Sequence, residues 1–238
     1  MIVRLVGSEM CIRDRLCAGR GDELPKSGDY MAFECGEQPV IIIRGTDGKL
    51  SARANICRHR MMRLVEGRGN TRKFTCPYHA WTYNLKGELV GAAYMDKTEC
   101  FNKADIRLPE VRCEEYLGWI YITLNEKAAP VATMLAPLLE HVTDYNMQDY
   151  VTIFTEDHVW DTNWKCLTEN FMEGYHLPVA HAATVGAHFP VEETIFDQRG
   201  SFPHFTLQLF KKTGTAPVGT AHPDNTSLQG EWPVSYTH

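Results

Sequence analysis

Two cysteine–histidine pairs in the first third of the chain have the spacing of metal ligands. Cys57 and His59 form a CxH pair, and Cys76 and His79 form a CxxH pair. Thiolates and imidazoles together suit a metal centre. The glycine-rich stretch 67–70 between the pairs is typical of a tight turn that brings two loops together. The sequence therefore predicts a metal centre held by two facing loops.

Two kinds of centre fit these four ligands. Zinc binds two cysteines and two histidines tetrahedrally, commonly with like residues paired on each loop. A two-iron cluster with unlike ends instead takes two thiolates on one iron and two imidazoles on the other. Each loop of this chain contributes one cysteine and one histidine, which favours the two-iron cluster over zinc.

A second pair of histidines lies further along the chain. His176 and His181 are five residues apart, so an intact helix would place them about 140° apart around its axis. Pro178 disfavours helix at Leu177 and lacks an amide donor, so we expect a helix to end near His176. The chain would then turn and direct both imidazoles at one metal ion.

The elements around the first two pairs read as hairpins. Residues 40–43 are a short β-branched run, 47–48 (Asp-Gly) is a hairpin signal, and 50–56 alternates apolar and polar residues. A second hairpin is predicted at 81–90, around the turn at 84–87. Both metal-binding loops would therefore lie at strand ends, on a rigid scaffold.

Further elements follow in chain order. A strand is expected at 117–124, then a linker from 126 to 137, a short helix at 138–145 and an extended stretch at 151–160. A helix is expected at 162–175, with strands between 194 and 210 and a loop-rich tail from 213 to 230. We expect Asp161 or Thr162 to cap the helix at 162–175. Its inward face would carry Trp164, Cys166, Leu167 and Phe171.

Composition excludes several classes of protein. The chain has 238 residues, enough for one large or two ordinary domains, with 44% apolar and 23% charged residues. A net charge of −6 argues against a nucleic-acid partner, and the apolar runs are shorter than the roughly 18 residues of a membrane span. Eight cysteines in so long a chain, with no convincing signal peptide, indicate a reducing cytoplasm.

The first two pairs carry a resemblance to a known family. CRH at 57–59 followed by CPYHAW at 76–81 resembles the Rieske motif of ring-hydroxylating oxygenase large (alpha) subunits. The resemblance implies that Cys57 and Cys76 hold the inner iron of a 2Fe-2S cluster and that His59 and His79 hold the outer iron. Because imidazole is neutral, such a cluster has a higher potential than an all-cysteine one. Trp81 and Tyr78 would pack beside it and limit water access.

The second stretch resembles the mononuclear iron site of the same family. The family's pattern is an acid, two residues, a histidine, four residues and a second histidine. Glu173, His176 and His181 match this pattern. The resemblance implies that both histidines bind Fe(II) in a facial triad, which leaves positions open for oxygen. Asn170 matches a family position close to the iron, and Glu173 matches the acid that joins the two metal centres. That acid is usually Asp, and Glu here resembles a branch acting on quaternary ammonium compounds such as carnitine.

The family's third iron ligand, a carboxylate far downstream, has no match here. Asp197 and Asp224 do not occupy the family position. We therefore expect the chain to be an N-terminal portion of a longer oxygenase, whose unfinished sheet exposes apolar surface and an open edge. The segments 1–15 and 233–238 resemble translated sequencing-adapter read-through and are expected to be foreign.

The expected fold class is α+β. A β-rich Rieske domain at 16–125 would precede the N-terminal part of a helix-grip catalytic domain (Bet v 1/START-like) at 126–232. The resemblance, which covers about 29–210, implies an oxygenase that hydroxylates, dihydroxylates or demethylates a small organic substrate with O2. Its electrons would come from NAD(P)H through a reductase or ferredoxin, and it would assemble as a homotrimer or a higher oligomer.

Two rival hypotheses remain at this stage. A Rieske ferredoxin-like electron carrier would need no second metal, so residues 173–181 argue against it. A zinc-binding interaction module is the other alternative.

Overall fold

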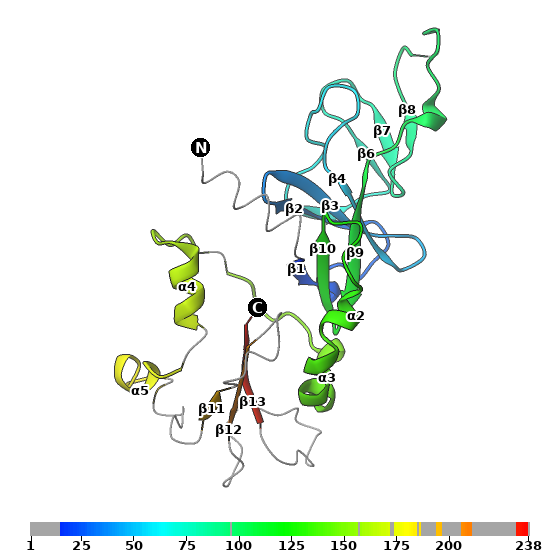
Figure 1. Ribbon diagram of the computed structural model, residues 1–238. Coiled ribbons are helices and arrows are strands. Elements are labelled where there is room, and N and C mark those ends of the chain that lie inside the picture. Colours follow the sequence, from blue (N-terminus) through cyan, green and yellow to red (C-terminus); the bar gives the residue numbers. More distant parts are fainter. Residues whose placement is uncertain are drawn as a thin grey trace. The chain divides into compact units, whose positions relative to one another are not determined.

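The computed structural model describes residues 15–95, 97–156, 158–171, 174–184 and 186, and strands at 194–196, 206–210 and 232–237. The chain divides into two compact units, Met1–Val131 and Ala132–His238 (Figure 1). The domain limits and foreign termini drawn from the sequence stay predictions, and residues 1–14 and 238 lie outside the described part. No helix of the described residues is long and apolar enough to cross a membrane.

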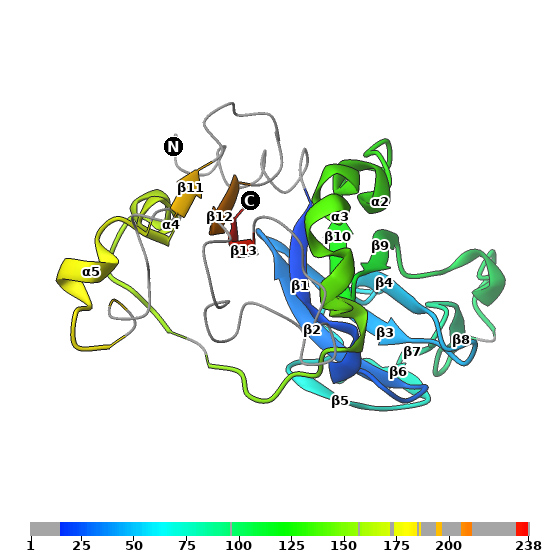
Figure 2. The ribbon, with the colours of Figure 1, turned by 90° about the horizontal axis from the view of Figure 1, so that it is seen from below.

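The first unit is built on two antiparallel sheets. The larger has the strand order β1-β10-β9-β4-β3-β2-β5, and the smaller has the order β6-β7-β8 (Figures 1 and 2). Two 3-10 turns, η1 (Gly21–Glu23) and η2 (Lys103–Asp105), lie between strands. The strands are β1 (Leu16–Arg20), β2 (Asp29–Cys35), β3 (Gln38–Arg44), β4 (Leu50–Ala54), β5 (Arg68–Asn70), β6 (Lys73–Thr75), β7 (Thr82–Asn84), β8 (Leu89–Gly91), β9 (Glu110–Tyr116) and β10 (Trp119–Thr123).

Strand β3 is buried on both faces and separates two hydrophobic clusters. Successive side chains of a strand point to opposite faces. Val40 and Ile42 accordingly lie in one cluster with the β1 and β10 side chains, and Ile41 and Ile43 lie in the other. The second cluster also contains Cys57 and other side chains of the metal-binding loops, so those loops are built on packed core.

The predicted hairpins are confirmed, but several strands of the larger sheet, β1, β5 and β9 among them, are not predicted, and β5 lies in the stretch 67–70 that is expected to be a turn. The turn between β3 and β4 has Gly48 at φ +76°, and the turn between β7 and β8 has Gly87 at φ +79°. Strand β10 lies inside the predicted 117–124. Strand β9 has no clear apolar alternation because four of its seven residues are charged. It exists because it pairs with β4 and β10.

An ionic cluster on β9 fixes the end of the first unit. Glu114 pairs with Arg15 at 2.7 Å and with Arg112 at 3.0 Å, and it accepts the Val131 N–H at 2.9 Å. Burial by itself would raise the pKa of the Glu114 carboxyl. The Val131 N–H and the two arginines together outweigh burial and lower that pKa.

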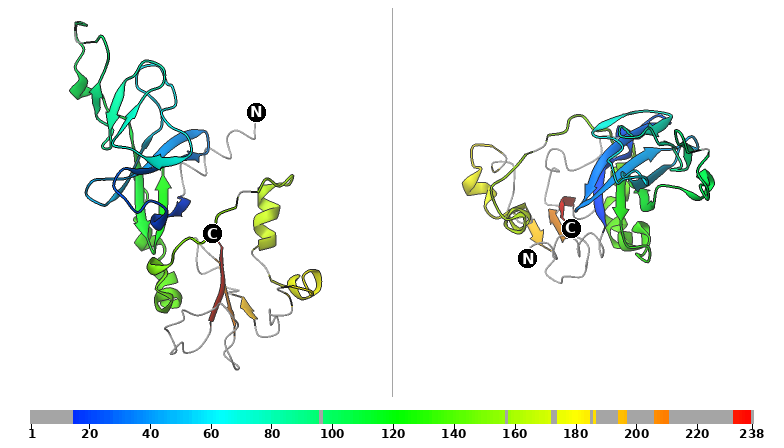
Figure 3. Two further views of the ribbon diagram at one scale, coloured as in Figure 1. Left: turned by 180° about the vertical axis from the view of Figure 1, so that it is seen from behind. Right: turned by 90° about the horizontal axis from the view of Figure 1, so that it is seen from above.

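The described part of the second unit has short helices and one sheet. The antiparallel order β11-β12-β13 is visible from both sides (Figures 1 and 3). Its expected helix-grip arrangement stays a prediction. The elements are α2 (Val131–Met134), which begins at the boundary, α3 (Ala136–Val142), η3 (Thr143–Tyr145), η4 (Met147–Asp149), α4 (Trp164–Phe171), α5 (Leu177–Ala180), β11 (Thr194–Phe196), β12 (Thr206–Phe210) and β13 (Trp232–Thr237).

Helix α4 differs from its prediction in extent, cap and exposure. It begins at Trp164, because the Asn163 side chain accepts the Lys165 N–H at 2.9 Å; Asp161 and Thr162 are not the cap. The predicted inward face is wrong, since Trp164 and Phe171 are 50% and 61% exposed. The expected apolar exposure is present here and on the preceding stretch, at Val151, Ile153, Phe154, Val159 and Trp160.

Candidate metal centre

The first metal-binding loop is a closed turn at the end of β4. The Cys57 N–H donates to the Met62 carbonyl at 2.8 Å, and the Cys57 carbonyl accepts the Met61 N–H at 3.0 Å. Met61 has a left-handed backbone with φ 56°. An isolated bridge between Ile56 and Arg63 closes the loop.

The second loop repeats this geometry between β6 and β7. The Cys76 N–H donates to the Trp81 carbonyl at 2.8 Å, and the Cys76 carbonyl accepts the Ala80 N–H at 3.0 Å. Ala80 also has φ 56°, and the pair Thr75–Thr82 closes the loop. The two loops therefore present their cysteines from equivalent positions.

The four predicted ligands come together in two unlike pairs. Cys57 and Cys76 are only 1% and 3% exposed and belong to one hydrophobic cluster. His59 and His79 are exposed, and their ring centroids lie 4.7 Å apart. The site therefore has a buried sulfur end and an exposed imidazole end.

Aromatic rings flank both imidazoles. Trp81 stacks on His59 with centroids 4.8 Å apart and planes 10° apart, and Phe101 meets Trp81 edge-on at 5.6 Å. The ring centroids of Tyr78 and His79 lie 3.7 Å apart. Trp81 is buried, whereas Tyr78 is 59% exposed, so it lies against His79 without being covered itself; the shielding of a cluster by these two rings stays a prediction.

Tyr83 links the two loops and is not among the residues that the sequence predicts for the site. Its hydroxyl lies 3.4 Å from the Cys57 sulfur and accepts the Arg58 N–H at 3.0 Å. Burial, followed by the hydrogen bond to Cys57, raises the pKa of Tyr83 far above its usual range, so the hydroxyl keeps its proton. The only sequence signal is its inward register on β7, next to Thr82 at the end of the second loop.

The electrostatics favour neutral imidazole at His59. Partial desolvation lowers the pKa of His59, and the neighbouring His79 and Arg60 lower it further. Neutral imidazole is the form that binds a metal.

The donor set fits a two-iron cluster better than a single metal ion. A tetrahedral zinc site needs four ligands around one point. A two-iron cluster needs only two protein ligands on each iron, which is how these donors are paired.

The second histidine pair is also brought together, but by a different turn from the one predicted. Ring centroids of His176 and His181 lie 5.5 Å apart, with planes at 66°. The two residues flank the one-turn helix α5, and the His181 N–H donates to the Leu177 carbonyl at 3.0 Å. Leu177 is therefore helical, contrary to expectation, because Pro178 lies in the first turn, where no amide donor is needed.

Of the other two predicted site residues, the structure describes one. Asn170 is described on α4, whereas Glu173 lies outside the described residues. Asp197 and Asp224 also lie outside them.

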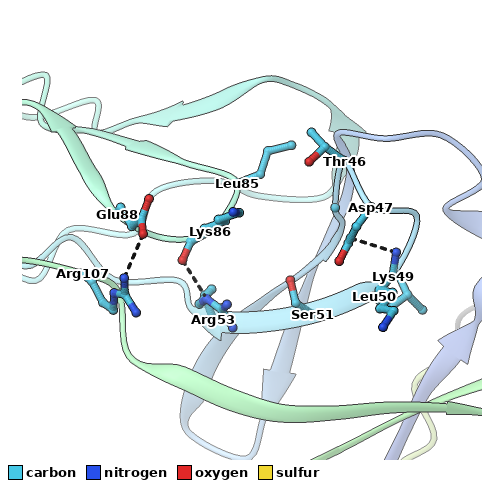
Figure 4. A pocket seen from close by; sticks show the side chains of 11 residues that line it. Thr46, Asp47, Lys49, Leu50, Ser51, Arg53, Leu85, Lys86, Glu88 and Arg107 are labelled. Carbon is cyan, nitrogen blue, oxygen red and sulfur yellow. Dashed lines mark hydrogen bonds and ion pairs between the residues drawn. The ribbon is translucent and has the colours of Figure 1, made fainter.

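A surface pocket of about 440 Å³ lies elsewhere on the first unit, beside the β3–β4 and β7–β8 turns (Figure 4). Arg53 donates to the Lys86 carbonyl at 3.2 Å, and Arg107 pairs with Glu88 at 2.9 Å. The residues that line this pocket do not include any of the predicted ligands.

Two family models match successive parts of the chain. Residues 14–102 match the Rieske [2Fe-2S] domain, and residues 141–232 match the ring hydroxylating alpha subunit (catalytic domain). The chain belongs to the Rieske ring-hydroxylating oxygenase alpha-subunit family. These two domains imply a 2Fe-2S cluster and a mononuclear iron.

Relatives of this alpha-subunit family cover most of the chain. The carnitine monooxygenase oxygenase subunit of Acinetobacter pittii is 34% identical over 169 residues, which are 70% of this chain and 46% of the relative. The toluate 1,2-dioxygenase alpha subunit of Pseudomonas putida is 31% identical over 170 residues, 67% of this chain and 37% of the relative.

A solved structure agrees with these relatives. The crystal structure of a quaternary ammonium Rieske monooxygenase in complex with an inhibitor superposes with a TM-score of 0.74 at 31% identity. The match covers 87% of this chain and 58% of that one. This chain thus spans about half the length of the proteins it matches.

Proposed function

We propose that this chain forms the electron-accepting part of a Rieske oxygenase alpha subunit. Cys57 and Cys76 bind the inner iron of the cluster, and His59 and His79 bind the outer iron. The observation that carries the proposal is the separation of buried sulfurs from exposed imidazoles on two loops of the same geometry. When bound, the cluster supplies one-electron transfer, and the mononuclear Fe(II) supplies O2 activation.

The surrounding residues have distinct tasks in this proposal. The packed core holds the two cysteines, and Trp81 with Phe101 excludes water beside His59. The Tyr83 hydroxyl donates a hydrogen bond to the Cys57 sulfur and accepts one from the Arg58 N–H. The exposed imidazole end is the side at which an electron enters or leaves.

The second centre is proposed to bind Fe(II) through His176 and His181. Their 5.5 Å ring separation supports a shared ion. Asn170 would lie close to that iron, and Glu173 would join the two metal centres. We assign no residue of this chain as the third ligand of that iron.

The substrate class proposed is a quaternary ammonium compound. The Glu173 position and the carnitine monooxygenase relative support this choice over an aromatic ring. The corresponding reaction is hydroxylation that leads to loss of a group from nitrogen; ring hydroxylation or dihydroxylation is the alternative outcome.

The remaining proposals concern partners and domain limits. Electrons from NAD(P)H would reach the cluster through a reductase or ferredoxin, and the whole subunit would form a homotrimer or higher oligomer. We propose residues 16–125 as the Rieske domain and 126–232 as the N-terminal part of the catalytic domain. Family matches on both sides of residue 126 support this division.

Anaerobic reconstitution with iron and sulfide tests the cluster. The dithionite-reduced chain should give a low-temperature EPR signal, and Cys57→Ser should abolish it. Cys100→Ser, which changes an exposed cysteine, is the matched control and should retain the signal. A colourless, EPR-silent protein that holds one zinc would refute the cluster.

Iron counting separates an oxygenase from an electron carrier. The oxygenase hypothesis predicts one iron more than the two of the cluster. The variants His176→Ala and His181→Ala should lose only the additional iron, whereas the exposed control His158→Ala should retain all three. A chain lengthened to the size of its relatives that still binds two irons would instead support the ferredoxin-like carrier.

A further inference from the structure

We propose that Asn55 is a positioning residue that holds the first cluster loop in its ligand-binding shape. The inference rests on the proposed function, because it concerns how the chain holds the cluster bound by Cys57 and His59. Asn55 itself touches neither the sulfur nor the imidazole of a proposed ligand; it acts through the backbone on both sides of the loop.

The Asn55 side chain is fully buried and fully engaged with the segment that leaves the loop. Its exposed fraction is 0%. Its Oδ1 accepts the N–H groups of Leu64 and Val65, both at 3.1 Å, and its Nδ2 donates to the Val65 carbonyl at 2.7 Å. Its backbone N–H donates to the Pro39 carbonyl on β3 at 2.8 Å. One side chain thereby joins the start of the loop to its end.

The second loop does not need such a residue, because a sheet closes it. Strands β6 and β7 pair in regular register from Thr75–Thr82 back to Lys73–Asn84. The first loop has only the single bridge between Ile56 and Arg63 outside any named strand. The amide of Asn55 supplies the backbone hydrogen bonds that a strand ladder supplies in the second loop.

This position gives Asn55 influence over both ends of the cluster. The first loop contributes one ligand to each proposed iron, Cys57 to the inner one and His59 to the outer one. A displaced loop therefore disturbs both ligand pairs at once. Residues that orient metal ligands commonly change metal affinity or activity by about 10–100-fold when they are replaced.

The test compares Asn55 with a residue that makes the same bonds elsewhere. Asn84 also captures two backbone N–H groups, those of Lys86 and Glu88, both at 3.0 Å, but in the β7–β8 turn. The variants Asn55→Ala, Asn55→Ser and Asn84→Ala are made in the whole chain and reconstituted with iron and sulfide. The rate of cluster loss to an iron chelator, the EPR g-values and the midpoint potential are measured for each.

We expect cluster loss from Asn55→Ala to be about tenfold faster than from the unmodified chain. Its EPR features should be broadened and its potential shifted. Asn55→Ser keeps a hydroxyl that can accept one of the two N–H groups, so it should be intermediate. Asn84→Ala should lower thermal stability without changing the spectrum, the potential or the rate of loss.

Three outcomes separate the possibilities. If Asn55→Ala does not fold by circular dichroism, Asn55→Ser decides. If the Asn55 variants retain the cluster with unchanged EPR and potential and lose stability no more than Asn84→Ala, the positioning role is refuted while the cluster stands. If the unmodified chain forms no cluster, the proposed function itself fails.

Discussion

Replacing Tyr83 by Phe removes one hydroxyl from the centre of the site and leaves the ring in place. The hydroxyl lies 3.4 Å from the Cys57 sulfur, and the Arg58 N–H donates to it at 3.0 Å. The reduced cluster carries one more negative charge than the oxidised cluster. The Tyr83 hydroxyl therefore stabilises the reduced state more, and its loss should lower the midpoint potential.

The size of this shift follows from the strength of the hydrogen bond. A hydrogen bond to a charged group contributes about 1.5–3 kcal/mol, of which only the difference between the two redox states acts on the potential. If that difference is about 1 kcal/mol, a one-electron couple shifts by roughly 40 mV, since about 59 mV corresponds to a tenfold change. Separately, the Arg58 N–H loses its acceptor, which should reduce the free energy of unfolding by about 1–3 kcal/mol.

A redox titration of the reconstituted chain, monitored by EPR, measures this shift. Tyr30→Phe is the matched control, since Tyr30 packs edge-on against Phe74 in the same hydrophobic cluster at 5.5 Å. Tyr30→Phe should leave the potential unchanged. A Tyr83→Phe potential within about 10 mV of the unmodified chain, on the scale used above, would refute the reasoning.

Three further predictions concern stability. Met61→Gly and Ala80→Gly should each raise the free energy of unfolding by about 0.5–1 kcal/mol, because glycine relieves the strain of the left-handed backbone at φ 56°. Gly48 lies at φ +76° with open space around it, so Gly48→Ala should lower the free energy of unfolding in the same denaturation assay. Glu114→Gln should reduce stability by about 1–2 kcal/mol at pH 7. Because the folded pKa of Glu114 lies below its unfolded value, that difference should shrink as the pH falls below about 4 and vanish once the pH is below the folded pKa; it should persist as the pH rises. The chain with its cluster should melt at a higher temperature than the chain stripped by chelator, since a group bound only by the folded state stabilises it; equal melting temperatures would contradict the ligand assignment.

Local signals predict the two hairpins of the first unit and strand β10, but not its other strands. The turns at Gly48 and Gly87 are encoded by the few residues that form them, and the β-branched run 40–43 is long enough to identify β3. Strand β9 is missed because its charged residues give no apolar alternation, and only its neighbours β4 and β10 make it a strand. The face of α4 is predicted wrongly because periodicity identifies an apolar stripe but does not supply the surface that covers it.

The sequence by itself determined which residues are candidates for metal chemistry. Ligand type and spacing are properties of the chain, so the two Cys–His pairs and the pair His176 and His181 stand out without any coordinates. Only the tertiary structure decided how these candidates are arranged: sulfurs buried, imidazoles exposed, and the first loop held by Asn55 and Tyr83. The physical reason is that burial and hydrogen bonding depend on partners brought close by folding, such as Tyr83 and Cys57, and no local pattern specifies those partners.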